Sequence, residues 1–268
     1  MIGNTLAFIF GSIVGSFLNV CIYRLPQSKS VVWPGSHCPK CEKRIPWYDN
    51  IPYLGFIMLK GKCRFCKKNI SLVYIAVELI TALMFVALFN RFGLTYDFCV
   101  YTVFACALIT ATFIDIYHRI IPYEISVGGL IVGVILNIIK GFNLSPFSWN
   151  YLPMLNALIG LLSGGLIIWL SGKIFDLVYF KLLKRPPIQG ETESMGGGDV
   201  LLLAMIGSFL GWQGALLTFF IAPFFGATVG IINLLVKKDH TIPYGPFLAV
   251  GALFSLFWAG NIIRIFLP

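Results

Sequence analysis

The sequence predicts an all-α polytopic membrane protein of about eight transmembrane helices, with a small polar domain between the first two. Three observations support this fold class. The chain of 268 residues is 58% hydrophobic and only 12% charged, whereas a soluble domain is about 25% charged. Apolar blocks of about 20 residues recur, which is the length that spans a bilayer. One basic, cysteine-containing segment interrupts them near the N-terminus.

The order of these segments predicts three parts. Residues 1–23 are apolar and lack both a preceding basic region and a small-residue cleavage site, so we expect a retained first transmembrane helix rather than a signal peptide. Residues 24–70 are expected to form an extramembrane domain, and residues 71–268 a membrane body of about seven helices. The predicted spans of that body lie near residues 71–90, 97–116, 121–140, 154–173, 200–213, 215–236 and 245–267.

Basic residues set the expected orientation. Ten of the 20 Lys and Arg residues lie in the segment 24–70, against two acidic residues there, Glu42 and Asp49. If this segment faces the cytoplasm and the spans alternate, 17 of the 20 basic residues lie on the cytoplasmic side. Cytoplasmic loops of membrane proteins carry this bias. The segment is therefore predicted to be a cytoplasmic domain, and both termini are expected outside.

The cytoplasmic segment contains two Cys-x2-Cys pairs, Cys38 with Cys41 and Cys63 with Cys66. Two such pairs can place four thiolates around one tetrahedral zinc ion. A domain of about 47 residues needs such additional stabilisation in order to fold. Disulfides and a redox pair are the alternatives, and the cytoplasm disfavours lasting disulfides. A nucleic-acid-binding zinc ribbon would use the same residues, but the tether to the bilayer favours membrane lipid as a partner and no nucleic acid.

Two acidic residues are candidates for catalysis. Asp115 ends the third predicted span on a face of small residues, and Asp199 follows three glycines at the start of the sixth. Taken singly, Asp115 could pair with Arg119 and Asp199 could cap a helix. Together, both are expected at the cytoplasmic ends of their helices, and two carboxylates that share a proton can hydrolyse an amide. Glu78, in the second span, is a candidate partner for a substrate amine or a structural residue.

Glycines recur within the predicted spans, including Gly11 and Gly15 in the first and Gly160 and Gly164 in the fifth. Small residues four positions apart let helix backbones approach closely in lipid. We expect these glycines to form helix-packing seams rather than catalytic features.

Several segments, in this order, resemble the type IV prepilin peptidases, which are GxGD-type aspartic membrane proteases of the bacterial inner membrane. They are GSFLNVCIYRLP at 15–26, the paired CPKC and CRFC around PWYDNIP, VELITAL at 77–83, Asp115 with Pro122, MGGGD at 195–199 and IPYGPFLAVGAL at 242–253. The resemblance covers nearly the whole chain. The combination is specific, whereas GxGD alone also fits presenilin-like and preflagellin peptidases, which lack the tetracysteine domain.

The resemblance implies cleavage, at the cytoplasmic membrane face, of the basic leader from type IV prepilins and pseudopilins of pilus and type II secretion systems. It also implies N-methylation of the new N-terminus with S-adenosylmethionine as methyl donor. By the motif match, Asp115 and Asp199 are catalytic, and Cys38, Cys41, Cys63 and Cys66 bind structural zinc. The sequence identifies no methyl-donor residues.

Two positions depart from the family pattern. Leu201 replaces a common Lys, and Tyr123 replaces a common acidic or amide residue, which changes the charge around the aspartates. A membrane-tethered zinc-ribbon scaffold or a proton-coupled transporter, each without peptidase activity, is the alternative function.

Overall fold

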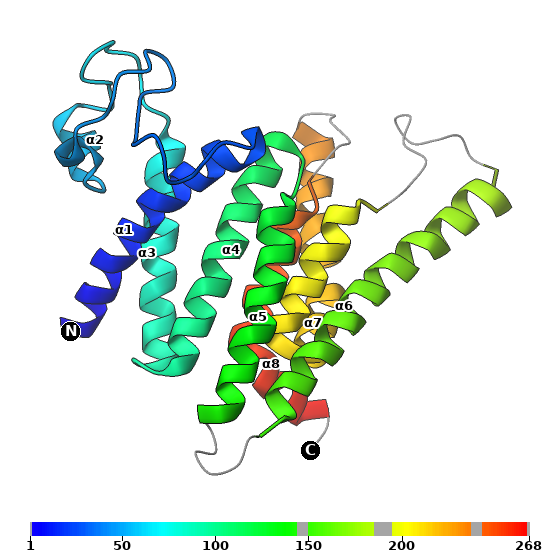
Figure 1. Cartoon of the computed structure of the whole chain (residues 1–268). Helices are drawn as coiled ribbons and strands as arrows, with labels where there is room; N and C mark the ends of the chain where they lie inside the picture. The colour runs from blue at the N-terminus through cyan, green and yellow to red at the C-terminus, as the bar shows by residue number, and fades with distance from the viewer. Residues whose placement is uncertain (1, 144–149, 185–194, 237–242, 267–268) are drawn as a thin grey trace. The chain divides into compact units, whose positions relative to one another are not determined.

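The computed structural model describes residues 2–143, 150–184, 195–236 and 243–266. These residues are mainly helical, apart from the long segment between the first two long helices, several short loops and two isolated β-bridges (Figure 1). The chain packs as two compact units, residues 1–114 and 115–268. The predicted division at residues 23 and 70 follows composition rather than packing, and it remains a prediction.

In the first unit, helices α1 (Ile2–Arg24) and α3 (Leu72–Phe92) pack closely together. Glycines make this possible: a Cβ on Gly11 would lie 2.8 Å from the Cα of Ala82, and one on Gly15 would lie 2.7 Å from the Cα of Glu78. The packing seam expected at Gly11 and Gly15 is thereby confirmed. Helix α4 (Tyr96–His118) follows α3 after a short turn.

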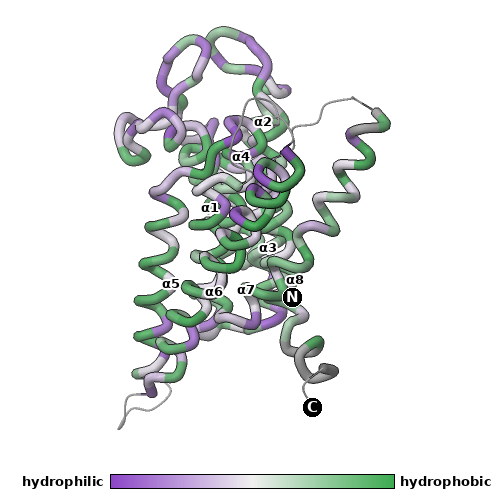
Figure 2. Tube along the Cα trace, turned by 90° about the vertical axis from the view of Figure 1, so that its right-hand side faces the viewer, coloured by the Kyte–Doolittle hydropathy of each residue, from purple (hydrophilic) through white to green (hydrophobic). Residues whose placement is uncertain are grey.

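The segment between α1 and α3 has little regular structure. It contains the short helix α2 (Leu54–Met58) and two 3-10 turns, Leu25–Gln27 and Trp47–Asn50. Hydrophilic residues concentrate in its loops, whereas the long helices are mainly hydrophobic (Figure 2). Arg64 donates two hydrogen bonds of 2.6 Å to Asp49, from Nε to Oδ2 and from Nη2 to Oδ1. This bidentate pair joins the second 3-10 turn to the second cysteine pair.

The second unit contains helices α5 (Tyr123–Asn143), α6 (Leu152–Asp176), α7 (Gly197–Val236) and α8 (Gly245–Phe266), and a π-helical turn (Leu177–Leu182) extends α6. Its core is the contact of α7 with α6 and α8. A Cβ on Gly160 would collide with the backbone of Gly207 and Gly211, and one on Gly164 would lie 2.5 Å from the carbonyl oxygen of Leu203. The seam expected at Gly160 and Gly164 is therefore confirmed.

Helix α7 reverses direction at Gly211, whose φ of 73° and ψ of −180° are not helical. Before this break α7 runs antiparallel to α6. After it, the Ser255 hydroxyl donates to the carbonyl of Gly214, and a Cβ on Gly226 would lie 3.3 Å from the ring of Phe247, so α7 runs antiparallel to α8. Figure 1 shows the first arm of α7 in yellow and the returning arm in orange.

The predicted fold class is confirmed. Six of the described helices are long and apolar enough to cross a membrane, α7 among them, and Gly245–Ala259 is a shorter apolar helix. Because Gly211 divides α7, the predicted spans 200–213 and 215–236 correspond to its two arms. Each of the eight expected spans thus has a helical counterpart in the described part of the chain. Many apolar side chains of these helices are exposed, as lipid contact requires.

Candidate functional site

The four predicted metal ligands lie together. The sulfur atoms of Cys38, Cys41, Cys63 and Cys66 are all within 4.8 Å of one another, and those of Cys38 and Cys66 are 3.9 Å apart. A tetrahedral site with zinc–sulfur bonds of about 2.3 Å requires sulfur atoms about 3.8 Å apart. The cluster therefore has the donor set and the size to bind one metal ion.

The two cysteine pairs have the same backbone conformation. In each, the first cysteine's N–H donates to the carbonyl five residues later, as from Cys38 to Lys43 and from Cys63 to Lys68. The residue four positions after that cysteine, Glu42 or Lys67, has a positive φ and donates back to it. The sequence carries this repeat as C-x2-C-x-K-x-I, at 38–45 and 63–70, which the sequence analysis did not identify.

Local hydrogen bonding also prepares one of these thiols for metal binding. The backbone N–H groups of Cys66 and Phe65 lower the pKa of the Cys63 thiol to about 7. The thiolate is the form that binds metal. These hydrogen bonds therefore favour the thiolate form of Cys63 over that of an ordinary cysteine.

Asp115 lies in the last turn of α4 and is 5% exposed. Its Oδ2 accepts a 2.9 Å hydrogen bond from the backbone N–H of Gly245, the first residue of α8. Asp115 therefore caps the N-terminus of α8, where the helix dipole favours an acidic group. The N–H of Arg119 donates to the Asp115 carbonyl and ends α4.

Asp199 lies in the first turn of α7, close enough to Asp115 for the two carboxylates to interact electrostatically. Ile121 packs against one glycine beside each aspartate. A Cβ on Gly198, which precedes Asp199, would lie 3.2 Å from the Cβ of Ile121, and a Cβ on Gly245, which donates to Asp115, would lie 3.3 Å from its Cδ1. The start of α7, the start of α8 and the turn after α4 thus converge. A Cβ on Gly196 would lie 3.6 Å from Oδ2 of Asp199, so this glycine leaves its Cβ position empty beside the carboxylate.

Tyr244 is a further polar residue at this point, and the sequence analysis did not single it out. Burial raises the pKa of Tyr244 to about 12, and the nearby Asp199 carboxylate contributes to the increase. The phenol therefore remains protonated at neutral pH and able to donate a hydrogen bond. Tyr244 and Gly245 both belong to the segment IPYGP, which is part of the family resemblance but suggested no role for either residue.

Comparisons with known proteins identify the family of this chain. The family "Bacterial Peptidase A24 N-terminal domain" matches residues 9–92, and "Type IV leader peptidase family" matches residues 102–231. A protein from Aeromonas salmonicida named prepilin leader peptidase/N-methyltransferase is 31% identical over 98% of this chain and 93% of its own length. The chain belongs to the type IV prepilin leader peptidase family.

Two further members of this peptidase family carry the same name. The Pseudomonas aeruginosa protein is 32% identical over 97% of this chain and 91% of its own length. The Myxococcus xanthus protein is 37% identical over 85% of this chain, and that match spans 62% of the Myxococcus protein. No solved structure shows significant similarity to the chain.

The two family models cover the two candidate sites of this prepilin leader peptidase family member separately. The N-terminal model covers most of α1, all four cysteines and α3, whereas the leader peptidase model covers Asp115 and Asp199. The metal cluster and the aspartate pair therefore belong to different family segments as well as to different packing units.

Proposed function

We propose that this chain removes the basic leader from type IV prepilins and pseudopilins by aspartic proteolysis and then N-methylates the new N-terminal residue. The observation that carries the proteolytic half is the proximity of Asp115, in the last turn of α4, and Asp199, in the first turn of α7. Family membership supports both halves, because its relatives are named for both activities.

The two aspartates carry out the hydrolysis as a pair. With one proton between them, the ionised carboxylate takes a proton from a water molecule, and the protonated carboxyl donates its proton to the scissile carbonyl oxygen. The water oxygen forms the new C–O bond, the C–N bond breaks, and the leaving amine takes up a proton. Because the two groups are strongly coupled, the acid and base roles belong to the pair.

The glycines before Asp199 are suited to an extended substrate. The Cβ position that Gly196 leaves empty lies 3.6 Å from Oδ2 of Asp199, which leaves room for a peptide backbone to approach the carboxylate. A prepilin presents a short basic leader followed by a long apolar helix. That helix can remain in the bilayer with the leader outside, so the junction between them is delivered to the helix ends where the aspartates lie.

The orientation follows from charge. Cytoplasmic placement of the basic segment 24–70 satisfies the positive-inside bias and also puts the aspartate ends of α4 and α7 on the cytoplasmic face. We assign the chain to the bacterial inner membrane, with its basic loops near anionic lipid and with no nucleic-acid partner.

We assign zinc to the tetracysteine cluster as a structural ion, because four thiolates at this spacing suit its tetrahedral preference. S-adenosylmethionine supplies the methyl group when bound.

The test is co-expression with a prepilin and mass spectrometry of the pilin N-terminus. Wild type should yield a pilin that lacks its leader and carries one added methyl group. Asp115→Asn and Asp199→Asn should each reduce cleavage by at least about 10³-fold. An asparagine oxygen can still accept the Gly245 hydrogen bond, so Asp115→Asn removes the charge and can keep the cap.

The matched control is Asp97→Asn, the same substitution in the first turn of α4. It should cleave like wild type. Full cleavage by either active-site variant would refute the aspartate assignment. If wild type produces no shortened pilin, a zinc-ribbon scaffold or a proton-coupled transporter becomes the better account.

A further inference from the structure

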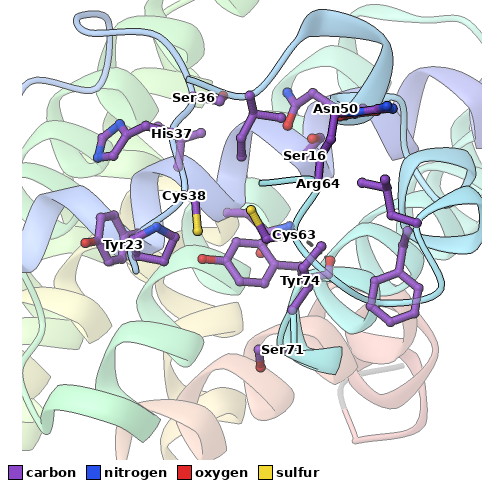
Figure 3. Close-up of a pocket in the computed structure, with 18 of the residues that line it drawn as sticks. Ser16, Tyr23, Ser36, His37, Cys38, Asn50, Cys63, Arg64, Ser71 and Tyr74 are labelled. Atoms are coloured by element: carbon purple, nitrogen blue, oxygen red, sulfur yellow. Dashed lines mark hydrogen bonds and ion pairs between the residues drawn. The ribbon is translucent and has the colours of Figure 1, made fainter. Parts of the chain in front are cut away.

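The first unit contains a cavity of about 480 Å³ that borders the tetracysteine cluster and extends beyond it. Its walls come from α1, α3 and the segment that carries the cysteine pairs. Figure 3 shows Tyr23 and Tyr74 at this cavity together with Cys38 and Cys63. The volume lies within the range of small-molecule sites, which are mostly apolar with a few polar groups. Two of the charged side chains that line the cavity, Glu78 and Arg24, indicate what kind of ligand it can bind.

Glu78 is one of them. It projects from α3, is 8% exposed, and accepts a 3.3 Å hydrogen bond from the backbone N–H of Tyr53, with the Ser16 hydroxyl as a further hydrogen-bond neighbour. In the part of the chain that the structure describes, Glu78 has no Lys, Arg or His partner. Tyr53, which donates this hydrogen bond, has a φ of 60°, a backbone conformation that is uncommon for residues other than glycine.

Arg24, at the end of α1, is the other charged group and is only 3% exposed. Its guanidinium donates to the carbonyl oxygens of Ser30, at 3.0 Å, and Gly35, at 3.2 Å. Within the described ranges no carboxylate lies at salt-bridge distance from it. A buried charge is costly unless it is paired. Nη2 of Arg24 also lies 3.5 Å from Nδ1 of His37. Among the described residues, the cavity is therefore lined by a buried guanidinium without a carboxylate partner and a buried carboxyl without a basic partner.

We propose that this cavity binds the methyl donor, S-adenosylmethionine, with Arg24 facing its carboxylate and Glu78 facing one of its cationic groups, the sulfonium or the ammonium. A ligand that carries both a carboxylate and a cationic group offers a partner to each of these side chains, which an apolar ligand or a simple anion does not. The proposal rests on the methyltransferase half of the proposed function.

The rest of the donor is aromatic, and the cavity has matching surfaces. The rings of Tyr23 and Tyr74 line it and lie near each other, and Phe56 contributes a third ring. Aromatic side chains stack on flat heterocycles such as adenine, and their faces also attract cations. The family model of the N-terminal domain covers all of these residues.

The experiment is equilibrium dialysis of the purified full-length chain in detergent micelles, without pilin. It compares S-adenosylmethionine, S-adenosylhomocysteine and decarboxylated S-adenosylmethionine. Wild type should bind the decarboxylated donor about tenfold or more weakly, because Arg24 loses its counter-charge. Equal affinity for the two donors would overturn the role of Arg24. This comparison uses wild-type protein, so no folding defect can affect it.

Glu78→Gln should weaken S-adenosylmethionine binding about tenfold or more. The matched control is Glu124→Gln, the same substitution at an exposed position of α5, which should bind like wild type. A loss confined to S-adenosylmethionine identifies the sulfonium as the group that Glu78 contacts, and an equal loss for S-adenosylhomocysteine identifies the ammonium. Unchanged binding of both would overturn the role of Glu78.

Two further readouts separate the possible failures. A metal content equal to that of wild type shows that the Glu78→Gln variant has a folded first unit. If wild type methylates pilin but Glu78→Gln binds the donor normally, only the site assignment fails. If wild type neither binds the donor nor methylates pilin, the methyltransferase half of the proposed function fails as well.

Discussion

The backbone N–H of Gly245 donates a 2.9 Å hydrogen bond to Oδ2 of Asp115, although the two residues are 130 positions apart. This bond makes the position of one candidate catalytic carboxylate depend on the first turn of α8. It also explains why position 245 is glycine, because a Cβ there would lie 2.7 Å from the same oxygen.

Gly245→Ala should therefore displace the Asp115 carboxylate and reduce leader cleavage about a hundredfold, the effect typical of a displacement of about 1 Å at a reacting group. Initial rates on a purified prepilin measure this. Gly128→Ala in α5, where a Cβ would meet no atom within 4 Å, should leave the rate unchanged. A wild-type rate in Gly245→Ala would show that Asp115 tolerates the movement.

Gly211→Ala should destabilise the second unit. A φ of 73° with a ψ of −180° is accessible essentially only to glycine, and forcing another residue there costs about 1–3 kcal/mol. A Cβ would also collide with the side chain of Asn156. Thermal unfolding in micelles should show a lower midpoint than wild type, again with Gly128→Ala as the control. An unchanged midpoint would mean that the reversal of α7 tolerates a side chain.

Cys63→Ser should remove the metal, because three thiolates and a hydroxyl bind zinc far more weakly than four thiolates. Elemental analysis should find about one zinc per chain in wild type and much less in the variant. Protein yield or methylation should fall more than leader cleavage, since the aspartates belong to the other unit. Cys99→Ser, at an exposed cysteine outside the cluster, is the control. Wild-type metal content in Cys63→Ser would refute the ligand assignment.

The Asp49–Arg64 pair should make the cysteine segment sensitive to acid. The two hydrogen bonds from Arg64 hold the pKa of Asp49 below its ordinary value. A lowered pKa in the folded state contributes stability above the unfolded pKa of about 3.9, and this contribution disappears as pH falls through the folded value. Asp49→Asn should thus have a lower unfolding midpoint than wild type near neutral pH, and the difference should shrink as the pH falls below about 4. A difference that does not vary with pH would exclude this ion pair as its cause.

Local sequence patterns were sufficient to predict the helices. Apolar blocks predicted the eight spans, including the two arms of α7, because lipid requires long apolar segments whatever their tertiary partners. The four cysteines could be grouped because their spacing confines each pair to one tight turn. Gly11, Gly15, Gly160 and Gly164 were recognised as packing positions by their spacing alone.

Contacts between distant segments were not predictable in the same way. No local pattern indicates that Gly245 donates to Asp115, or that Arg24 and Glu78 line one cavity, since each contact depends on how separate helices pack. The repeated conformation of the cysteine pairs was visible in the sequence, but it required an alignment of residues 38–45 with residues 63–70. The predicted roles of Asp115 and Asp199 still await the experiments above, although the structure brings the two together.

The reversal at Gly211 determines how deeply Asp199 is immersed. The first arm of α7 runs from Gly197 to Leu210, and its 14 residues measure about 21 Å along the axis. The hydrocarbon core of a bilayer is about 30 Å thick. An arm of this length that turns at one surface ends about 9 Å below the other. Substrate and water must descend past the lipid headgroups to reach Asp199, so the thickness of the surrounding bilayer should itself influence how fast the leader is removed.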